Sequence, residues 1–106
     1  MRQMLQAFGP RFSDIAQEYK SSLPTRLAAM RDAAHMGAHE VLAAAAHSLA
    51  GGSASLGAIR VSGLCRKLED DCSHGAVPVD WQYRLGEIAH ACNAFSERLT
   101  LLGETS

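Results

Sequence analysis

The stretch from Ala38 to Leu56 reads AHEVLAAAAHSLAGGSASL. Its apolar residues recur at steps of three and four, the spacing of one face of an α-helix. The residues that share this face are Leu42, Ala45, Leu49, Ser53 and Leu56. Alanine is the strongest helix former, and Gly57 follows as a stop signal. This stretch therefore predicts an amphipathic helix with one buried side.

The same spacing predicts three further helices around this one. They span about Arg11 to Ala34, Ala58 to Asp71 and Val79 to Leu102, with loops at Met36-Gly37 and Ser73 to Val79. Their apolar stripes are Phe12, Ile15, Tyr19, Leu23, Leu27, Met30 and Ala34; then Val61, Leu64, Cys65, Leu68 and Cys72; then Trp81, Leu85, Ile88, Cys92, Phe95, Leu99 and Leu102.

Two local features modify this pattern. Pro24 interrupts the first stripe, so we expect a kink there, or a break with Ser21 or Ser22 capping a second segment. Residues 1–8 could form a short extra N-terminal helix, which Gly9 and Pro10 would end. Four amphipathic helices joined by short loops pack most simply as an all-α, antiparallel up-down four-helix bundle. We expect residues 1–106 to be a single domain, with the core bundle at about 11–102.

Composition excludes several classes of protein. The 106 residues carry a net charge of -1, which does not suit a nucleic-acid surface. No apolar run approaches the roughly 20 residues of a membrane span. The three cysteines are odd in number and widely spaced, which indicates a reducing compartment. We expect Cys65 and Cys72 to be buried core thiols, and the spacing of Cys72 and His74 matches no common zinc site.

His47 lies on the other side of the central helix. At about 100° per residue it falls about 140° from Leu42, so we expect its imidazole to point out of the bundle. Small residues surround it, although an exposed helix face normally carries Lys, Glu, Arg or Gln. We expect these small residues to form a bare docking surface for a partner protein: Ala43, Ala44, Ala50, Gly51 and Ala54.

An exposed imidazole can serve as a nucleophile. Attack on an acyl phosphate would give an N-phosphoryl histidine, and phosphoryl transfer rests mostly on positioning and charge neutralisation. From the helix pattern alone, an unreactive surface histidine on an alanine-rich helix explains His47 equally well.

The segment from His47 to Ala58, HSLAGGSASLGA, resembles the signature of histidine phosphotransfer (HPt) domains. In that signature, His-x-Leu-Lys-Gly leads through small residues to Leu-Gly-Ala. The segment from Leu64 to Glu69, LCRKLE, is similar to the family's next helix, often Leu-Cys-x-x-Leu-Glu. The similarity is strong from Ala43 to Glu69 and is elsewhere a match of helix pattern and length.

The resemblance implies that His47 is the phosphoacceptor and that Gly51 keeps its approach open. It implies a phosphorelay, in which the receiver domain of a hybrid kinase donates a phosphoryl group from an aspartyl phosphate and a response-regulator receiver accepts it. Such modules often lie at the C-terminus of hybrid sensor histidine kinases and have no independent catalytic activity. We expect no cofactor or metal in this chain, and Mg²⁺ on the partner receiver.

Composition, together with the resemblance, sets the expected assembly and place in the cell. We expect a cytoplasmic monomer that contacts neither nucleic acid nor membrane, on a parent protein that could be anchored in the inner membrane.

One residue departs from the signature. Ala50 stands where the family commonly has a lysine, one turn from the phosphoryl group. Arg60, Arg66, Lys67 or the partner could compensate for it. Without a replacement, the alternative is a catalytically silent bundle that docks receiver domains or dimerises.

Overall fold

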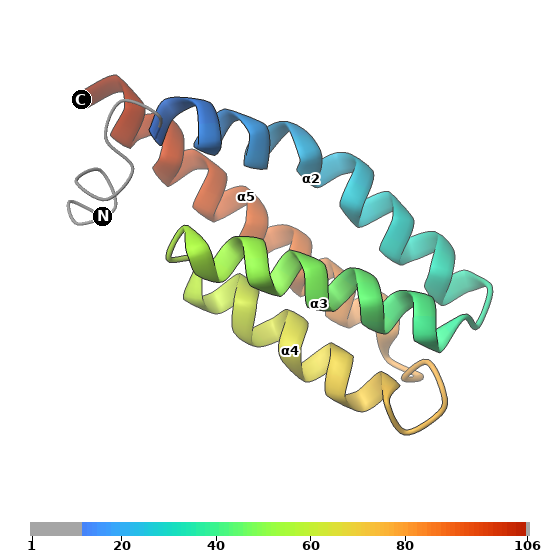
Figure 1. The fold of residues 1–106 in the computed structure, drawn as a ribbon. Helices are drawn as coiled ribbons and strands as arrows, with labels where there is room; N and C mark the ends of the chain where they lie inside the picture. Colours follow the sequence, from blue (N-terminus) through green and yellow to red (C-terminus); the bar gives the residue numbers. More distant parts are fainter. Residues whose placement is uncertain (1–11, 106) are drawn as a thin grey trace.

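Residues 12–105, the part of the chain that the computed structural model describes, form four α-helices that run in alternating directions (Figure 1). The helices are α2 (Phe12–His35), α3 (His39–Ser55), α4 (Ile59–Cys72) and α5 (Trp81–Thr105). Helices α2 and α4 each pack against both α3 and α5. The predicted all-α, antiparallel four-helix bundle is therefore confirmed, while the expected helix at residues 1–8 lies outside the described residues.

Helix α2 passes through Pro24 without a break. Of the two outcomes expected at Pro24, a kink or a break, the break is therefore wrong, and neither Ser21 nor Ser22 caps a second segment. Their hydroxyl groups instead donate to backbone oxygens within the helix, Ser21 to Gln17 at 2.8 Å and Ser22 to Tyr19 at 2.8 Å. Burial of the apolar stripe on both sides of the proline holds the helix together, as Leu23 and Met30 are both in the core.

Two glycine turns of the same design reverse the chain on either side of α3. Gly37 and Gly57 have φ angles of 68° and 85°, in the region that favours glycine. In each turn the following alanine donates its N–H five residues back, Ala38 to Ala33 at 2.9 Å and Ala58 to Ser53 at 2.8 Å. This is the Schellman pattern of helix ends. Gly57 thus ends α3 as predicted, and both reversals are tight.

The core lies along the predicted stripes. Its largest fully buried apolar side chains include Met30, Leu42, Leu49, Leu68, Ile88 and Leu99. In α3 the stripe is shifted slightly from the prediction, because Ala46 is fully buried and Ala45 is only half-buried. The three cysteines are buried free thiols, as expected for Cys65 and Cys72.

One arginine bridges the two ends of the connection from α4 to α5. Arg84 forms ion pairs with Asp71 at the end of α4 and, at 3.0 Å, with Asp80 just before α5. The hydrogen bond from Arg84 holds the pKa of the Asp71 carboxyl below its usual value. Val79 was predicted to begin the last helix but is fully exposed in the loop, since α5 begins at Trp81.

In the range 12–105, none of the helices combines the length and the hydropathy that a membrane crossing requires.

Candidate functional site

His47 lies on the outer face of α3, and its side chain is 75% exposed. The predicted direction of the imidazole is therefore confirmed. The opposite face of the same helix turn carries Ala46 and Leu49, which are buried in the core. Packing of these residues fixes the rotation of α3, so the imidazole stands on a rigid element with its ring in solvent.

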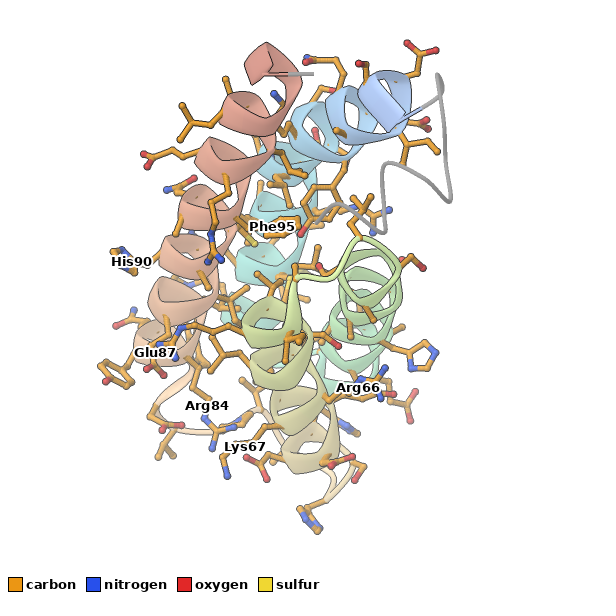
Figure 2. The ribbon with its side chains drawn as sticks, turned by 90° about the vertical axis from the view of Figure 1, so that its left-hand side faces the viewer. Arg66, Lys67, Arg84, Glu87, His90 and Phe95 are labelled. Carbon is orange, nitrogen blue, oxygen red and sulfur yellow. The ribbon has the colours of Figure 1, made fainter. Side chains whose placement is uncertain are left out.

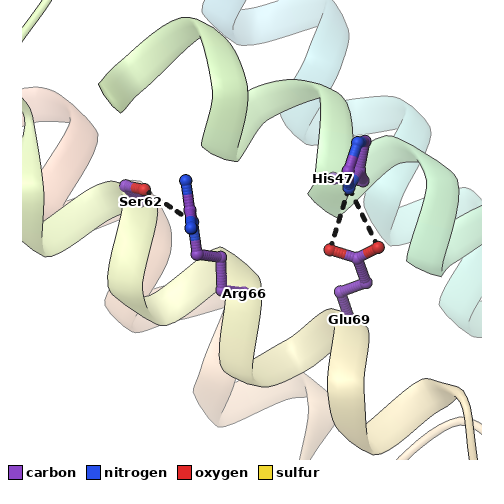
Figure 3. A network of polar contacts seen from close by, with 4 residues as sticks. All are labelled: His47, Ser62, Arg66 and Glu69. Carbon is purple, nitrogen blue, oxygen red and sulfur yellow. Dashed lines mark hydrogen bonds and ion pairs between the residues drawn. The ribbon is translucent and has the colours of Figure 1, made fainter. Parts of the chain in front are cut away.

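Glu69 of α4 holds one nitrogen of this imidazole (Figure 3). The Nδ1 atom of His47 lies 3.1 Å from Oε1 and 3.0 Å from Oε2 of Glu69. A carboxylate accepts hydrogen bonds but cannot donate, so Nδ1 carries the hydrogen. In the neutral ring the lone pair is then on Nε2, the nitrogen that Glu69 does not engage. The contact thus fixes the ring orientation and leaves the lone pair of the neutral ring on Nε2.

The register of the α3–α4 hairpin accounts for this contact. Ala58 lies at the turn, and His47 and Glu69 are each 11 residues from it (58 − 47 and 69 − 58). By the same count, Ala50 and Arg66 are each 8 residues from Ala58 (58 − 50 and 66 − 58). Because each helix rises about 1.5 Å per residue, residues equally distant from the turn lie at about the same level along the hairpin. His47 therefore lies level with Glu69, and Ala50 lies level with Arg66.

A shallow hollow lies between the two helices beside His47. Its lining residues are His47, Ala50, Gly51, Arg66, Glu69 and Asp70. The Arg66 Nε donates to Ser62 at 3.2 Å, which draws the guanidinium along α4 toward the α3 side (Figure 3). Within residues 12–105, no carboxylate lies within ion-pair distance of Arg66. The hollow thus joins an imidazole and a cation for which the described residues offer no ion-pair partner.

The predicted docking residues divide into two groups. Ala44, Gly51 and Ala54 are exposed around His47, whereas Ala43 is half-buried against the core. Ala50 is only 3% exposed, so the expectation that it points outward is wrong. At about 100° per residue, Ala50 falls about 80° from Leu42 and so closer to the core stripe than His47. Its small side chain lies at the floor of the hollow.

The two glycines after Ala50 have space around them. A Cβ added to Gly51 or Gly52 would meet no atom within 4 Å. Neither glycine has a positive φ angle, so neither is required by the backbone. Glycine inside a helix costs roughly 1 kcal/mol relative to alanine. Packing within the chain therefore does not explain these glycines, while an approaching partner would use the space they leave.

On its other side, α3 is held against α2 by side-chain hydrogen bonds. Arg26 donates to Ser48 at 2.9 Å, and the hydroxyl groups of Tyr19 and Ser53 are 2.7 Å apart in the interior. Burial raises the pKa of Tyr19 to about 12, so its phenol is neutral. These contacts anchor the helix that carries His47.

Sequence reasoning missed the contact of Glu69 with His47, and it gave Arg66 only as one of several cations that could compensate for Ala50. Both residues belong to LCRKLE, the segment that is similar to the family's next helix, but that similarity assigns neither of them a place beside His47. Counting residues outward from the glycine turn would have placed Glu69 level with His47 and Arg66 level with Ala50. No group of three or more His, Cys, Asp or Glu side chains among the described residues is placed to hold a metal ion, and this includes the surroundings of Cys72 and His74.

Comparison with known proteins gives one family. Residues 14–100 match the family model described as Hpt domain. No curated protein and no solved structure matches the chain.

Proposed function

Because the chain belongs to the Hpt domain family, whose members carry out histidine-containing phosphotransfer in two-component signalling, we propose that His47 is its phosphoacceptor. In this proposal, His47 takes the phosphoryl group from an aspartyl phosphate of one receiver domain and passes it to the receiver of a response regulator. The observation that carries the proposal is the exposed imidazole whose Nδ1 is held by Glu69 at 3.0 Å.

The geometry favours attack by Nε2. The Nε2 lone pair forms the bond to phosphorus, and the phosphorus–oxygen bond to the partner aspartate breaks. The electron pair of that bond leaves with the aspartate carboxylate. The hydrogen stays on Nδ1, and the ring gains positive charge that the Glu69 carboxylate faces. Onward transfer is the reverse step on a second receiver. No proton has to be removed from the imidazole before attack.

The surface around His47 suits a receiver as partner. Transfer requires the reacting atoms of the two proteins to approach to about 3–3.5 Å, so the partner must press closely against the surface around His47. Ala44, Gly51 and Ala54 leave that approach free of long side chains. We further propose that the partner receiver holds the Mg²⁺ ion and that this chain works without a cofactor or metal of its own. The proposed setting is a cytoplasmic, monomeric module of a hybrid sensor histidine kinase.

Labelling from a phosphorylated receiver tests the proposal. A receiver domain carrying a radioactive phosphoryl group should label the wild-type chain, and His47→Gln should abolish that labelling. His90→Gln is the matched control, because His90 is an exposed histidine on α5, a helix that does not pack against α3. Labelling of the His47→Gln variant at the wild-type level would contradict the assignment.

The alternative function is a silent bundle that docks receivers or dimerises. Ala50, in place of the family's common lysine, is the observation that favours it. It predicts receiver binding without labelling, or a dimer on a sizing column. A labelled monomer excludes it.

A further inference from the structure

We infer that Arg66 supplies the positive charge that neutralises the phosphoryl group on His47. This inference rests on the proposed function, since it names the residue that contacts the transferred group. A phosphoryl group on Nε2 carries negative charge beside α3, and helix α3 itself has no cation next to His47. The nearest candidate must therefore come from a neighbouring helix.

Arg66 meets this requirement by its position. It lies level with Ala50 across the hairpin, at equal distance from the Ala58 turn. Arg66, Ala50 and His47 line the same hollow. The methyl group of Ala50 is buried at its floor, so no long α3 side chain fills the space between the imidazole and the guanidinium.

Arg66 also has free hydrogen-bonding capacity. Its Nε is bound to Ser62, but within the described range neither terminal nitrogen has a protein partner. A guanidinium presents its donors in a planar fork that matches two phosphoryl oxygens. The hydrogen bond from Nε to Ser62 orients the guanidinium and leaves its two terminal nitrogens available to donate to a phosphoryl group.

The other cations lie elsewhere. Arg60 lines a separate groove between α4 and α5, together with His90 and Arg98. Lys67 lies on the side of α4 that faces Arg84, whereas Arg66 points to the opposite side (Figure 2). Arg26 of α2 is bound to Ser48 and Ser22 and does not line the hollow.

Two carboxylates share the hollow with Arg66. Glu69 is engaged with Nδ1, while Asp70 lies at the rim and opposes a phosphoryl anion. Removing the two charges should therefore have opposite effects: loss of Arg66 destabilises the phosphorylated form, and loss of Asp70 stabilises it.

A test without any receiver isolates this effect. Phosphoramidate can phosphorylate a histidine directly: Nε2 bonds to phosphorus, the phosphorus–nitrogen bond breaks, and its electron pair leaves with ammonia. In ³¹P NMR titrations of the product, Arg66→Gln should raise the second pKa of the phosphoryl group by about half a pH unit. Arg66→Lys should retain most of the wild-type value, and Asp70→Asn should lower it.

The matched control is Lys67→Gln, which removes the same charge one residue along α4 and should leave the titration unchanged. With a receiver, Arg66→Gln should shift the phosphoryl equilibrium toward the receiver by about twofold to fivefold. A folded double variant, Arg66→Gln with Ala50→Lys, should recover the wild-type titration, since it returns a positive charge to the same hollow.

The outcomes separate the two proposals. If Arg66→Gln and Lys67→Gln both titrate like wild type while His47 is labelled, the inference on Arg66 is wrong and the proposed function stands. Labelling that survives His47→Gln overturns both. Circular dichroism of each variant checks the fold. Arg66 is exposed, so its replacement should leave the core intact, and Arg66→Lys provides a second variant with a side chain of similar size.

Discussion

Glu69 has two roles at the scale of a single residue. Its carboxylate keeps the hydrogen of His47 on Nδ1, and in the proposed function it would face the positive charge that the ring gains on phosphorylation. The same group would then select the attacking nitrogen and stabilise the product. Such an arrangement resembles the carboxylate partners that orient histidines at metal and catalytic sites.

Replacing Glu69 with glutamine should separate these roles from simple packing. The amide can both donate and accept, so it no longer imposes one tautomer on His47, and it carries no charge. We expect phosphorylation by phosphoramidate to slow by about fivefold, the scale of an exposed charged contact. Nitrogen NMR of the neutral imidazole should show a mixture of tautomers instead of Nδ1–H alone.

The control for Glu69 is Glu87→Gln on α5, which should change neither the rate nor the tautomer. If the Glu69→Gln variant keeps the wild-type rate and a single Nδ1–H tautomer, Glu69 does not orient the ring.

At the scale of the element, Gly51 of α3 belongs to the proposed docking surface for a partner. Gly51 lies in mid-helix with open space around it, where a larger residue would strengthen the helix. The proposed docking surface would give this glycine a role toward a partner, and this can be tested by changing the size of the side chain alone.

We expect Gly51→Ala to raise the free energy of unfolding by about 0.5–1 kcal/mol, because alanine restricts the unfolded chain and favours the helix. Gly51→Gln should reduce labelling from a phosphorylated receiver by about tenfold or more, the order expected when a side chain blocks close docking. Labelling by phosphoramidate, which needs no docking, should stay within about twofold of wild type.

Gly86→Gln is the matched control for this pair of assays. Gly86 is an exposed helical glycine of α5 that likewise has open space around it. It should leave both assays unchanged. A different result would be that the Gly51→Gln variant loses labelling by the receiver and by phosphoramidate to the same extent. That result would mean that the new side chain obstructs the imidazole itself, and it would contradict a docking role for this surface.

The elements themselves could be predicted from sequence because each buries a regular apolar stripe, as Leu42, Leu49 and Ile88 illustrate. The outward direction of His47 followed from the same periodicity. Periodicity within one helix cannot reveal what another helix contributes. For this reason the contact of Glu69 with His47 was missed, and Arg66 could not be singled out from Arg60 and Lys67. Ala50 was misplaced because it lies at the border between the buried and exposed faces, where neighbouring α4 decides its exposure.

At the scale of the whole molecule, the buried cysteine thiols make the free energy of unfolding depend on pH. Burial raises the pKa of Cys65 to about 12 and that of Cys92 to about 11, from an ordinary value near 9. Below pH 9 the thiols are protonated in both the folded and the unfolded chain, so they add no pH dependence. Above it, the unfolded chain loses these protons first, and stability falls as pH rises.

Urea unfolding between pH 7 and 10 should reveal this loss. Once the unfolded thiols ionise, each buried thiol contributes a slope of up to about 1.4 kcal/mol per pH unit. A Cys65→Ala, Cys92→Ala double variant will be less stable overall but should show a shallower fall above pH 9. An unchanged slope in the folded double variant would contradict the assignment to these thiols.

The hairpin register has a consequence for how such chains can diverge. Positions 50 and 66 line one hollow from two helices, so a positive charge at either position could serve the same imidazole. Compared with the family signature one position at a time, this chain lacks the lysine at position 50. In the proposed role of Arg66, the charge is kept and only the helix that carries it differs. Substitutions at the two positions should therefore compensate for one another in evolution.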